Sequence, residues 1–301
     1  MFKPKKLILN FLTISRANLQ LASLPHATLG IVLGVSSLSS LPSWSVATYV
    51  LLVFTLITFA CNLNCLCDIE VDGRHKKYMS NAAKSIGVRN IKIILVLELI
   101  LIFYLMYTIR EHIITIFLSL LGLFFAITYS ANPFRIKARG ILSPFPVLIG
   151  LYTLTVLGGW FLVNDSFPLH LTLFSIGYAL MNEGITLVNT CEDYSEDQEE
   201  GIKTWAHIFG LKKTLMLAFI FTFLGLSCII SIFIKTMIPT FLTLILVVIS
   251  TFSILKTTKQ IYGISKASNL EKSAKKHAPK MGKWFMMTRY PLLLVSLSLL
   301  I

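Results

Sequence analysis

The stretch NLNCLCDIEVD at residues 62–72 decides how this chain folds, and LVNTCEDYSED at residues 187–197 repeats its pattern. Each stretch ends a strongly apolar segment and holds one Asn and two Asp, spaced four residues apart. The first trio is Asn64, Asp68 and Asp72, and the second trio is Asn189, Asp193 and Asp197. Four-residue steps advance about 400° around an α-helix, so each trio lines one face over about 12 Å. Carboxylates beside apolar segments are costly unless a metal or charged ligand compensates them, which indicates a functional site.

The composition identifies the class of protein. The chain has 301 residues, 55% of them hydrophobic, a mean hydropathy of +0.76 and only 14% charged residues. A soluble domain carries about a quarter charged residues. The sequence therefore predicts an all-α integral membrane protein, placed in the cell membrane.

Nine apolar runs approach the length of roughly 20 residues that a membrane-spanning helix needs. The expected spans are 19–41, 44–66, 90–109, 112–129, 141–163, 169–191, 211–234, 237–256 and 283–301. A further amphipathic stretch, residues 5–15, is expected to lie as a helix at the membrane surface. We therefore expect nine transmembrane helices and a surface helix before them.

The basic residues predict the orientation. Most of the 27 Lys and Arg residues lie in the N-terminal segment or in the connections after the second, fourth, sixth and eighth spans. The positive-inside rule places these segments in the cytoplasm and the C-terminus outside. Both trios then lie on the cytoplasmic side. The net charge of +13 is explained by orientation, anionic lipid and anionic substrates, and nucleic acid is not an expected partner.

The equal offset of the two trios indicates an internal repeat. Both stand at the end of the second helix of a four-helix half, so the halves, about 17–140 and 141–256, would be parallel repeats. We expect one domain over residues 1–301, with two four-helix halves plus one helix around a central cavity. The long charged connections at 67–89 and 192–213 are expected to form cytoplasmic helices that cap the cavity.

The chemistry of the trios favours a magnesium site. Mg²⁺ prefers oxygen ligands and is commonly held by one or two carboxylates together with substrate phosphates. Two facing half-sites would fit a diphosphate bridged by metal ions. Basic residues that could neutralise a diphosphate leaving group stand near both trios: Arg74, His75, Lys76, Lys77, Arg135, Lys137, Arg139 and Lys203. For any one of them, the positive-inside rule is an equally good explanation.

The segment YSANPFRIK at residues 129–137 resembles the YS…P.R.K stretch of the UbiA superfamily of intramembrane prenyltransferases. The two trios resemble that family's NxxxDxxxD motif and its second DxxxD motif, in the same order. The resemblance implies that Mg²⁺ binds a polyprenyl diphosphate, and that an acceptor captures the allylic carbocation left when diphosphate departs. It implies metal-binding and catalytic roles for Asp68, Asp72, Asp193 and Asp197, with Asn64 as a further metal ligand.

Other residues follow from the same resemblance or from helical spacing. Residues expected to bind substrate are Asn64, Asn189, Arg16, Arg74, Lys77, Tyr129, Ser130, Arg135, Lys137, Lys203 and Asn182. Arg16 would face the cavity mouth and bind a polar acceptor, or it would extend to the lipid surface. Glu183 and Glu98 are acids at membrane depth, and they are expected to contact the acceptor, to remove a proton from it, or to be structural acids.

The acceptor is left open by the sequence. The stretch after Asp72, GRHKKYMSNAAKSIG, departs from better-known branches, which carry an Arg-Pro or Pro-rich segment there. An aromatic or quinone precursor is favoured, and an ether lipid, a carotenoid or a tetrapyrrole is an alternative.

Two other classes of membrane protein also combine transmembrane helices with acidic residues. A transporter would place its acids near the midplane, and a phosphatidyl-type alcohol transferase would gather them in one compact motif.

Overall fold

The computed structural model describes residues 4–41, 43–235 and 240–300, and within these ranges it contains helices and no β-strand. The long helices are α2 (Ala17–Gly34), α3 (Ser43–Cys67), α6 (Val88–Thr108), α7 (Ile113–Ser130), α9 (Leu169–Glu192), α14 (Phe241–Ser265) and α16 (Met281–Ser298). Two further rods are each made of two helices: η4 (Pro146–Thr153) with α8 (Leu154–Phe161), and α12 (Leu211–Leu224) with α13 (Leu226–Lys235). The short helices are α1 (Pro4–Ile14), η1 (Leu38–Ser40), α4 (Ile69–Arg74), α5 (Lys77–Ile86), η2 (Ile136–Ala138), η3 (Gly140–Leu142), α10 (Tyr194–Glu199), α11 (Trp205–Phe209), α15 (Leu270–His277) and η5 (Ala278–Lys280).

Seven helical segments in the described ranges are long and apolar enough to cross a membrane. They confirm the all-helical membrane class, and they begin close to seven of the expected spans. Two expected spans differ. The α-helix of the span 19–41 ends at Gly34, and its apolar part, Leu19–Gly34, is shorter than the others. The span 283–301 corresponds to α16, whose apolar pattern is interrupted by Arg289 and Pro291. Residues 237–239 and 301 of the expected spans lie outside the described residues.

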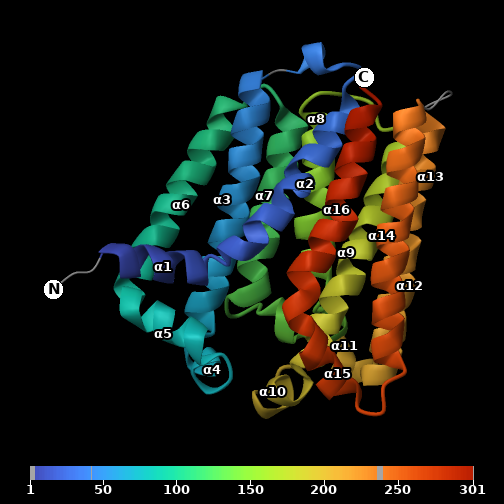
Figure 1. Cartoon of the computed structure of the whole chain (residues 1–301). Coiled ribbons are helices and arrows are strands. Elements are labelled where there is room, and N and C mark those ends of the chain that lie inside the picture. Colours follow the sequence, from blue (N-terminus) through green and yellow to red (C-terminus); the bar gives the residue numbers. More distant parts are fainter. Residues whose placement is uncertain (1–3, 42, 236–239, 301) are drawn as a thin grey trace.

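The helices form one bundle, with the short helices α4, α5, α10, α11 and α15 gathered at one end (Figure 1). The two helices that carry the trios have equivalent neighbours, since α3 packs against α6 and α9 packs against α12. Helix α2 lies between the two sides and contacts both α8 and α16. This arrangement places the ends of α3 and α9 at the same end of the bundle.

Small residues allow the closest helix crossings. At Gly30, where α2 meets α8, an added Cβ would overlap the carbonyl oxygen of Val156 and would lie 2.7 Å from the backbone nitrogen of Trp160. Because lipid provides no hydrophobic drive for helix association, membrane helices gain stability from such close backbone packing. Gly30 therefore allows α2 to pack directly against the rod made of η4 and α8.

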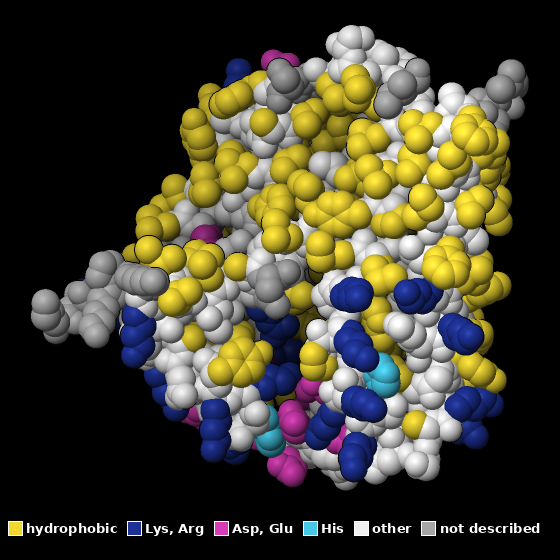
Figure 2. Space-filling model, viewed as in Figure 1, with side chains coloured by type: hydrophobic (Ala, Val, Ile, Leu, Met, Phe, Trp, Pro, Cys, Tyr) yellow, Lys and Arg dark blue, Asp and Glu magenta, His cyan; other side chains and the backbone are white. Residues whose placement is uncertain are grey.

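The surface divides into an apolar part and a charged end. Figure 2 shows hydrophobic side chains over most of the bundle, and Lys and Arg side chains gathered around the end that carries α4, α5, α10 and α15. Acidic side chains lie in the middle of this charged end, beside a hollow. A lipid-facing band next to a basic rim is the pattern expected for a membrane protein at a water interface.

Candidate active site

The first trio keeps its helical register across a break in the chain. Helix α3 ends at Cys67 and α4 begins at Ile69, yet the backbone N–H of Asp68 donates to the carbonyl of Asn64 at 3.0 Å. The N–H of Asp72 donates in turn to the carbonyl of Asp68 at 2.8 Å. These two bonds repeat the four-residue step of an α-helix, so the three side chains stay on one side of the chain.

The YSANPFRIK segment supplies the partners of the first trio. Asp68 is 8% exposed, and its carboxylate accepts a hydrogen bond from Arg135 Nη2 at 3.1 Å and forms an ion pair with Lys137 Nζ. The side-chain amide of Asn64 donates to the hydroxyl of Ser130 at 3.0 Å. Arg135 has a φ of 38°, a left-handed conformation that non-glycine residues rarely adopt. The local backbone therefore bends to place two cations on one buried carboxylate.

The second trio repeats this geometry at the end of α9. The N–H of Asp193 donates to the carbonyl of Asn189 at 3.1 Å, and the N–H of Asp197 donates to the carbonyl of Asp193 at 2.8 Å. The side-chain amide of Asn189 donates to Asp193 Oδ2 at 3.2 Å. Asp193 Oδ1 is buried and has no hydrogen-bond partner among the described residues. A buried carboxylate oxygen without a hydrogen-bond partner is unfavourable, and a bound ligand would satisfy it.

Contacts between the two halves bring the trios together. Lys76, which follows α4, donates to Asp193 Oδ2 at 2.9 Å. Arg74 pairs with Glu200, and His75 Nε2 lies 3.1 Å from the same carboxylate. The segment after the first trio is thus tied to the segment after the second. The segments that carry the ends of the two trios, α4 and α10, therefore meet at one end of the bundle (Figure 1).

The electrostatics of the site favour a bound cation. Burial raises the pKa of Asp72, and it raises the pKa of Asp197 to about 7. The next carboxylate adds to the shift in each case, Asp68 for Asp72 and Asp193 for Asp197. Lys76 opposes both shifts, so it lies near both trios. Buried like charges disfavour ionisation unless additional positive charge is present.

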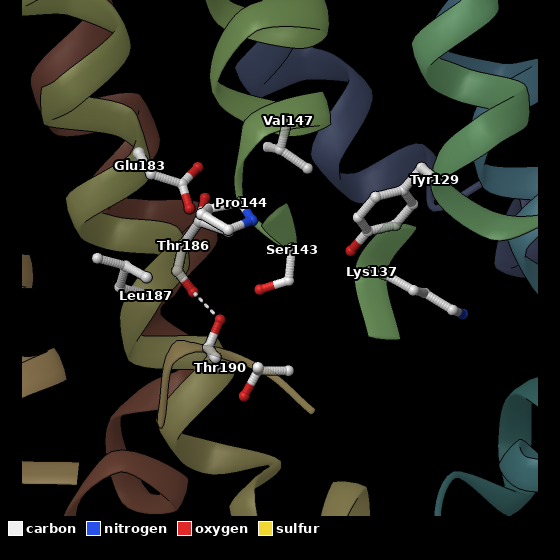
Figure 3. A pocket seen from close by; sticks show the side chains of 10 residues that line it. Tyr129, Lys137, Ser143, Pro144, Val147, Glu183, Thr186, Leu187 and Thr190 are labelled. Atoms are coloured by element: carbon white, nitrogen blue, oxygen red, sulfur yellow. Dashed lines mark hydrogen bonds between the residues drawn. The ribbon is translucent and has the colours of Figure 1, made fainter. Parts of the chain in front are cut away.

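A small cavity of about 50 Å³ adjoins the site (Figure 3). Tyr129 and Lys137 line one side of it, and Glu183, Thr186 and Thr190 of α9 line the other. Because Lys137 also pairs with Asp68, the cavity is connected to the first trio through this lysine.

A family model described as the UbiA prenyltransferase family matches residues 23–276, a range that includes both trios and the YSANPFRIK segment. The chain belongs to the UbiA prenyltransferase family. This confirms the resemblance noted in the sequence and the prediction of an enzyme of the prenyltransferase class. No curated protein matches the chain significantly.

Solved structures of UbiA homologues share the fold. A homologue from Archaeoglobus fulgidus bound to GPP and Mg²⁺ has a TM-score of 0.69 and 18% identity, covering 94% of this chain and 99% of its own. A structure described as a digeranylgeranylglyceryl phosphate synthase has a TM-score of 0.69 and 18% identity, covering 97% and 99%. A homologue from Aeropyrum pernix K1 in its apo form has a TM-score of 0.62 and 15% identity, covering 93% and 96%. At these identities the comparison establishes the UbiA fold.

The remaining predicted residues of this UbiA-family chain occupy different positions. Arg16 is exposed at the start of α2, and it lies close enough to Asp72 for its charge to oppose the rise in the pKa of that carboxyl group, which burial causes. The side chains of Lys77 and Lys203 are exposed, and neither forms an ion pair with a described residue. Asn182 is fully buried, and its side-chain amide oxygen Oδ1 accepts a hydrogen bond from Arg289.

Two cations in the structure have contacts that the sequence did not predict. Lys76 belongs to the basic run after the first trio, in which Lys77 is the predicted substrate-binding lysine, and it is Lys76 that reaches Asp193. Arg289 lies within the expected span 283–301, and in the structure it is buried and donates hydrogen bonds to the side-chain amide oxygen of Asn182 and the backbone carbonyl of Ala22. A buried arginine in a predicted span was itself a signal for a specific interaction.

The oxygen atoms of the two trios suit a metal ion whose coordination is completed by substrate. Within the described residues, no group of three or more His, Cys, Asp or Glu side chains converges closely enough to hold a metal ion on its own. The two trios instead offer separate oxygen ligands, among them the buried Asp193 Oδ1. This fits Mg²⁺, which keeps several waters and shares carboxylates with phosphate oxygens, better than a metal enclosed by protein ligands.

Proposed function

We propose that this protein transfers a prenyl group from an allylic polyprenyl diphosphate to a lipophilic acceptor and releases diphosphate, with Mg²⁺ as the cofactor. The observation that carries the proposal is the convergence of the two trios, which are linked by Lys76 and Asp193 at 2.9 Å. Two structural neighbours are described as bound to GPP or DMAPP together with Mg²⁺. Their likeness in fold supports the same class of donor here.

The trios would hold the cofactor. Candidate ligands are Asn64, Asp68, Asp72, Asp193 and Asp197, with Asn189 holding Asp193 in place. Bound Mg²⁺ would neutralise the negative charge that develops on the departing diphosphate. The two halves of the site lie on different helices, which suits a diphosphate that joins them.

Basic side chains would bind the diphosphate. Arg135 and Lys137 already contact Asp68, and Lys76 contacts Asp193, so all three stand beside the acidic faces. Burial lowers the pKa of Lys137, and the charge of Asp68 opposes that shift. Cations positioned in advance stabilise the leaving group without reorganisation during the reaction. Arg74 would act at a distance, by holding Glu200 and joining the two segments.

We propose the following arrangement in the membrane. α2 and α16 also cross it, which gives nine spans in one domain with two repeated halves plus one helix. The basic end of the bundle, with the N-terminus and the site, would lie in the cytoplasm, and the C-terminus would lie outside. The short helices α4, α5, α10 and α11 would cap the site on the cytoplasmic side, where Figure 2 shows the charged side chains.

Magnesium-dependent donor binding tests the proposal. Purified protein in detergent is titrated with GPP, with Mg²⁺ and with EDTA instead of Mg²⁺. Wild-type protein should bind only with Mg²⁺, and Asp68→Ala and Asp193→Ala should each lose this binding. Glu70→Ala is the matched control, because Glu70 is an exposed acid on α4 between two members of the first trio. Unchanged binding in both Asp variants would remove the trios from the donor site.

A further inference from the structure

Glu183 is an acid that has no role in the proposed donor site. It lies on α9, is 1% exposed, and its Oε2 atom is buried without a hydrogen-bond partner among the described residues. No described residue forms an ion pair with it. An ionisable side chain at membrane depth is rare and usually faces a partner or a ligand. A buried polar atom without a partner carries a large desolvation cost, which a ligand would offset.

Glu183 lines the cavity beside the donor site. Figure 3 shows its carboxyl group turned from α9 toward the segment that carries Pro144 and Val147. Hydroxyl groups of Tyr129, Ser143, Thr186 and Thr190 line the same space. At about 50 Å³ the cavity has room for a few water-sized groups, so it would take the polar end of a molecule and not its apolar body.

The second acid that the sequence placed at membrane depth provides a contrast. Glu98 on α6 is 9% exposed, but its Oε1 atom accepts a hydrogen bond from the amide of Asn62 at 2.7 Å. Asn62 also accepts a hydrogen bond from the hydroxyl of Ser15 at 3.0 Å. Glu98 therefore has a structural role in a buried network, and it does not line the cavity next to the donor site.

We propose that Glu183 binds the acceptor through a hydroxyl group that the acceptor donates. This inference rests on the proposed function and names the acceptor class. The carboxyl oxygens of Glu183 accept hydrogen bonds, and a hydroxyl group of the acceptor supplies the donor that they lack. The acceptor is then a lipophilic phenol or alcohol, and a carotenoid hydrocarbon does not fit. Lys137 both lines the cavity and pairs with Asp68, so a hydroxyl group bound in the cavity would lie next to the donor site.

Matched pairs of probes test the inference. Binding constants are measured for 4-hexylphenol against 4-hexylanisole, and for 1-dodecanol against its methyl ether, in the wild type, Glu183→Leu and Glu183→Gln. The wild type should prefer one hydroxyl probe over its ether by about 3- to 10-fold, the net contribution of one hydrogen bond. The two arms distinguish a phenolic from an alcoholic acceptor. Leu should abolish the preference, because it has no acceptor, and Gln, which keeps a carbonyl acceptor, should retain part of it.

Stability separates a binding role from a structural one. Since Glu183 has no partner to lose, Glu183→Leu should melt at or above the wild-type temperature. Glu98→Leu is the control: it leaves the Asn62 amide unpaired, so it should melt lower and keep the hydroxyl preference. A wild type without preference in either arm, or a preference that survives in Glu183→Leu, would overturn the inference. GPP binding with Mg²⁺ should be unchanged in Glu183→Leu, so a failure of the proposed function appears separately, in the wild-type GPP titration.

Discussion

The protonation of Asp197 should make metal-assisted donor binding depend on pH. Burial and the charge of Asp193 raise the pKa of Asp197 to about 7, against an ordinary value of about 3.9. A carboxyl group must lose its proton before it can ligate Mg²⁺. Roughly one molecule in eleven carries an ionised Asp197 one pH unit below its pKa, and roughly ten in eleven one unit above it. The affinity for GPP with Mg²⁺ should therefore rise about tenfold from pH 6 to pH 8, or about 1.4 kcal/mol.

The assay for this prediction is a GPP titration at fixed Mg²⁺ and at pH 6, 7 and 8, in the wild type and in Asp197→Asn. The variant should bind more weakly overall, because it has lost a ligand, and its affinity should change less with pH, because an amide does not titrate in this range. GPP's own ionisation affects both proteins equally, so the ratio of their affinities isolates Asp197. A ratio that stays constant from pH 6 to pH 8 would refute the reasoning.

Two further substitutions have matched controls in the chain. Lys76→Met removes a partly exposed ion pair with Asp193 and should weaken GPP binding about fivefold, whereas Lys77→Met, which removes an exposed lysine, should stay within about twofold. Equal effects in the two titrations would contradict the role of Lys76. Gly30→Ala forces a Cβ into the backbone of α8, so it should cost about 3 kcal/mol and lower the Tm by several degrees. Gly263→Ala on α14 meets no atom within 4 Å, so it should raise the Tm slightly; a Tm for Gly30→Ala at or above wild type would count against the close crossing.

Hydropathy made most of the fold readable from the sequence. Seven of the expected spans correspond to helical segments that can cross a membrane, because lipid requires each span to satisfy its own backbone hydrogen bonds within one long apolar run. The two expected spans that are not among these seven are those in which the apolar helical pattern is interrupted. α2 ends early at Gly34, and α16 carries Arg289 and Pro291. Arg289 is tolerated there because Asn182 and Ala22 accept its hydrogen bonds, and these partners come from other helices.

Within the candidate site, the sequence by itself determined the two acidic faces. A four-residue spacing needs only helical backbone to align its side chains, and the backbone hydrogen bonds continue through both helix breaks. Only the tertiary structure decided which cations meet them. Lys76 and Lys77 are adjacent and chemically identical, yet one reaches Asp193 and the other is exposed. That choice depends on where α4 lies relative to α9.

Glu183 and Glu98 are likewise equivalent in the sequence, as acids in apolar helices. Packing alone gives Glu98 an amide partner and leaves Glu183 facing a cavity. Spacing along one helix is local information, whereas partners across the bundle depend on how separate helices pack.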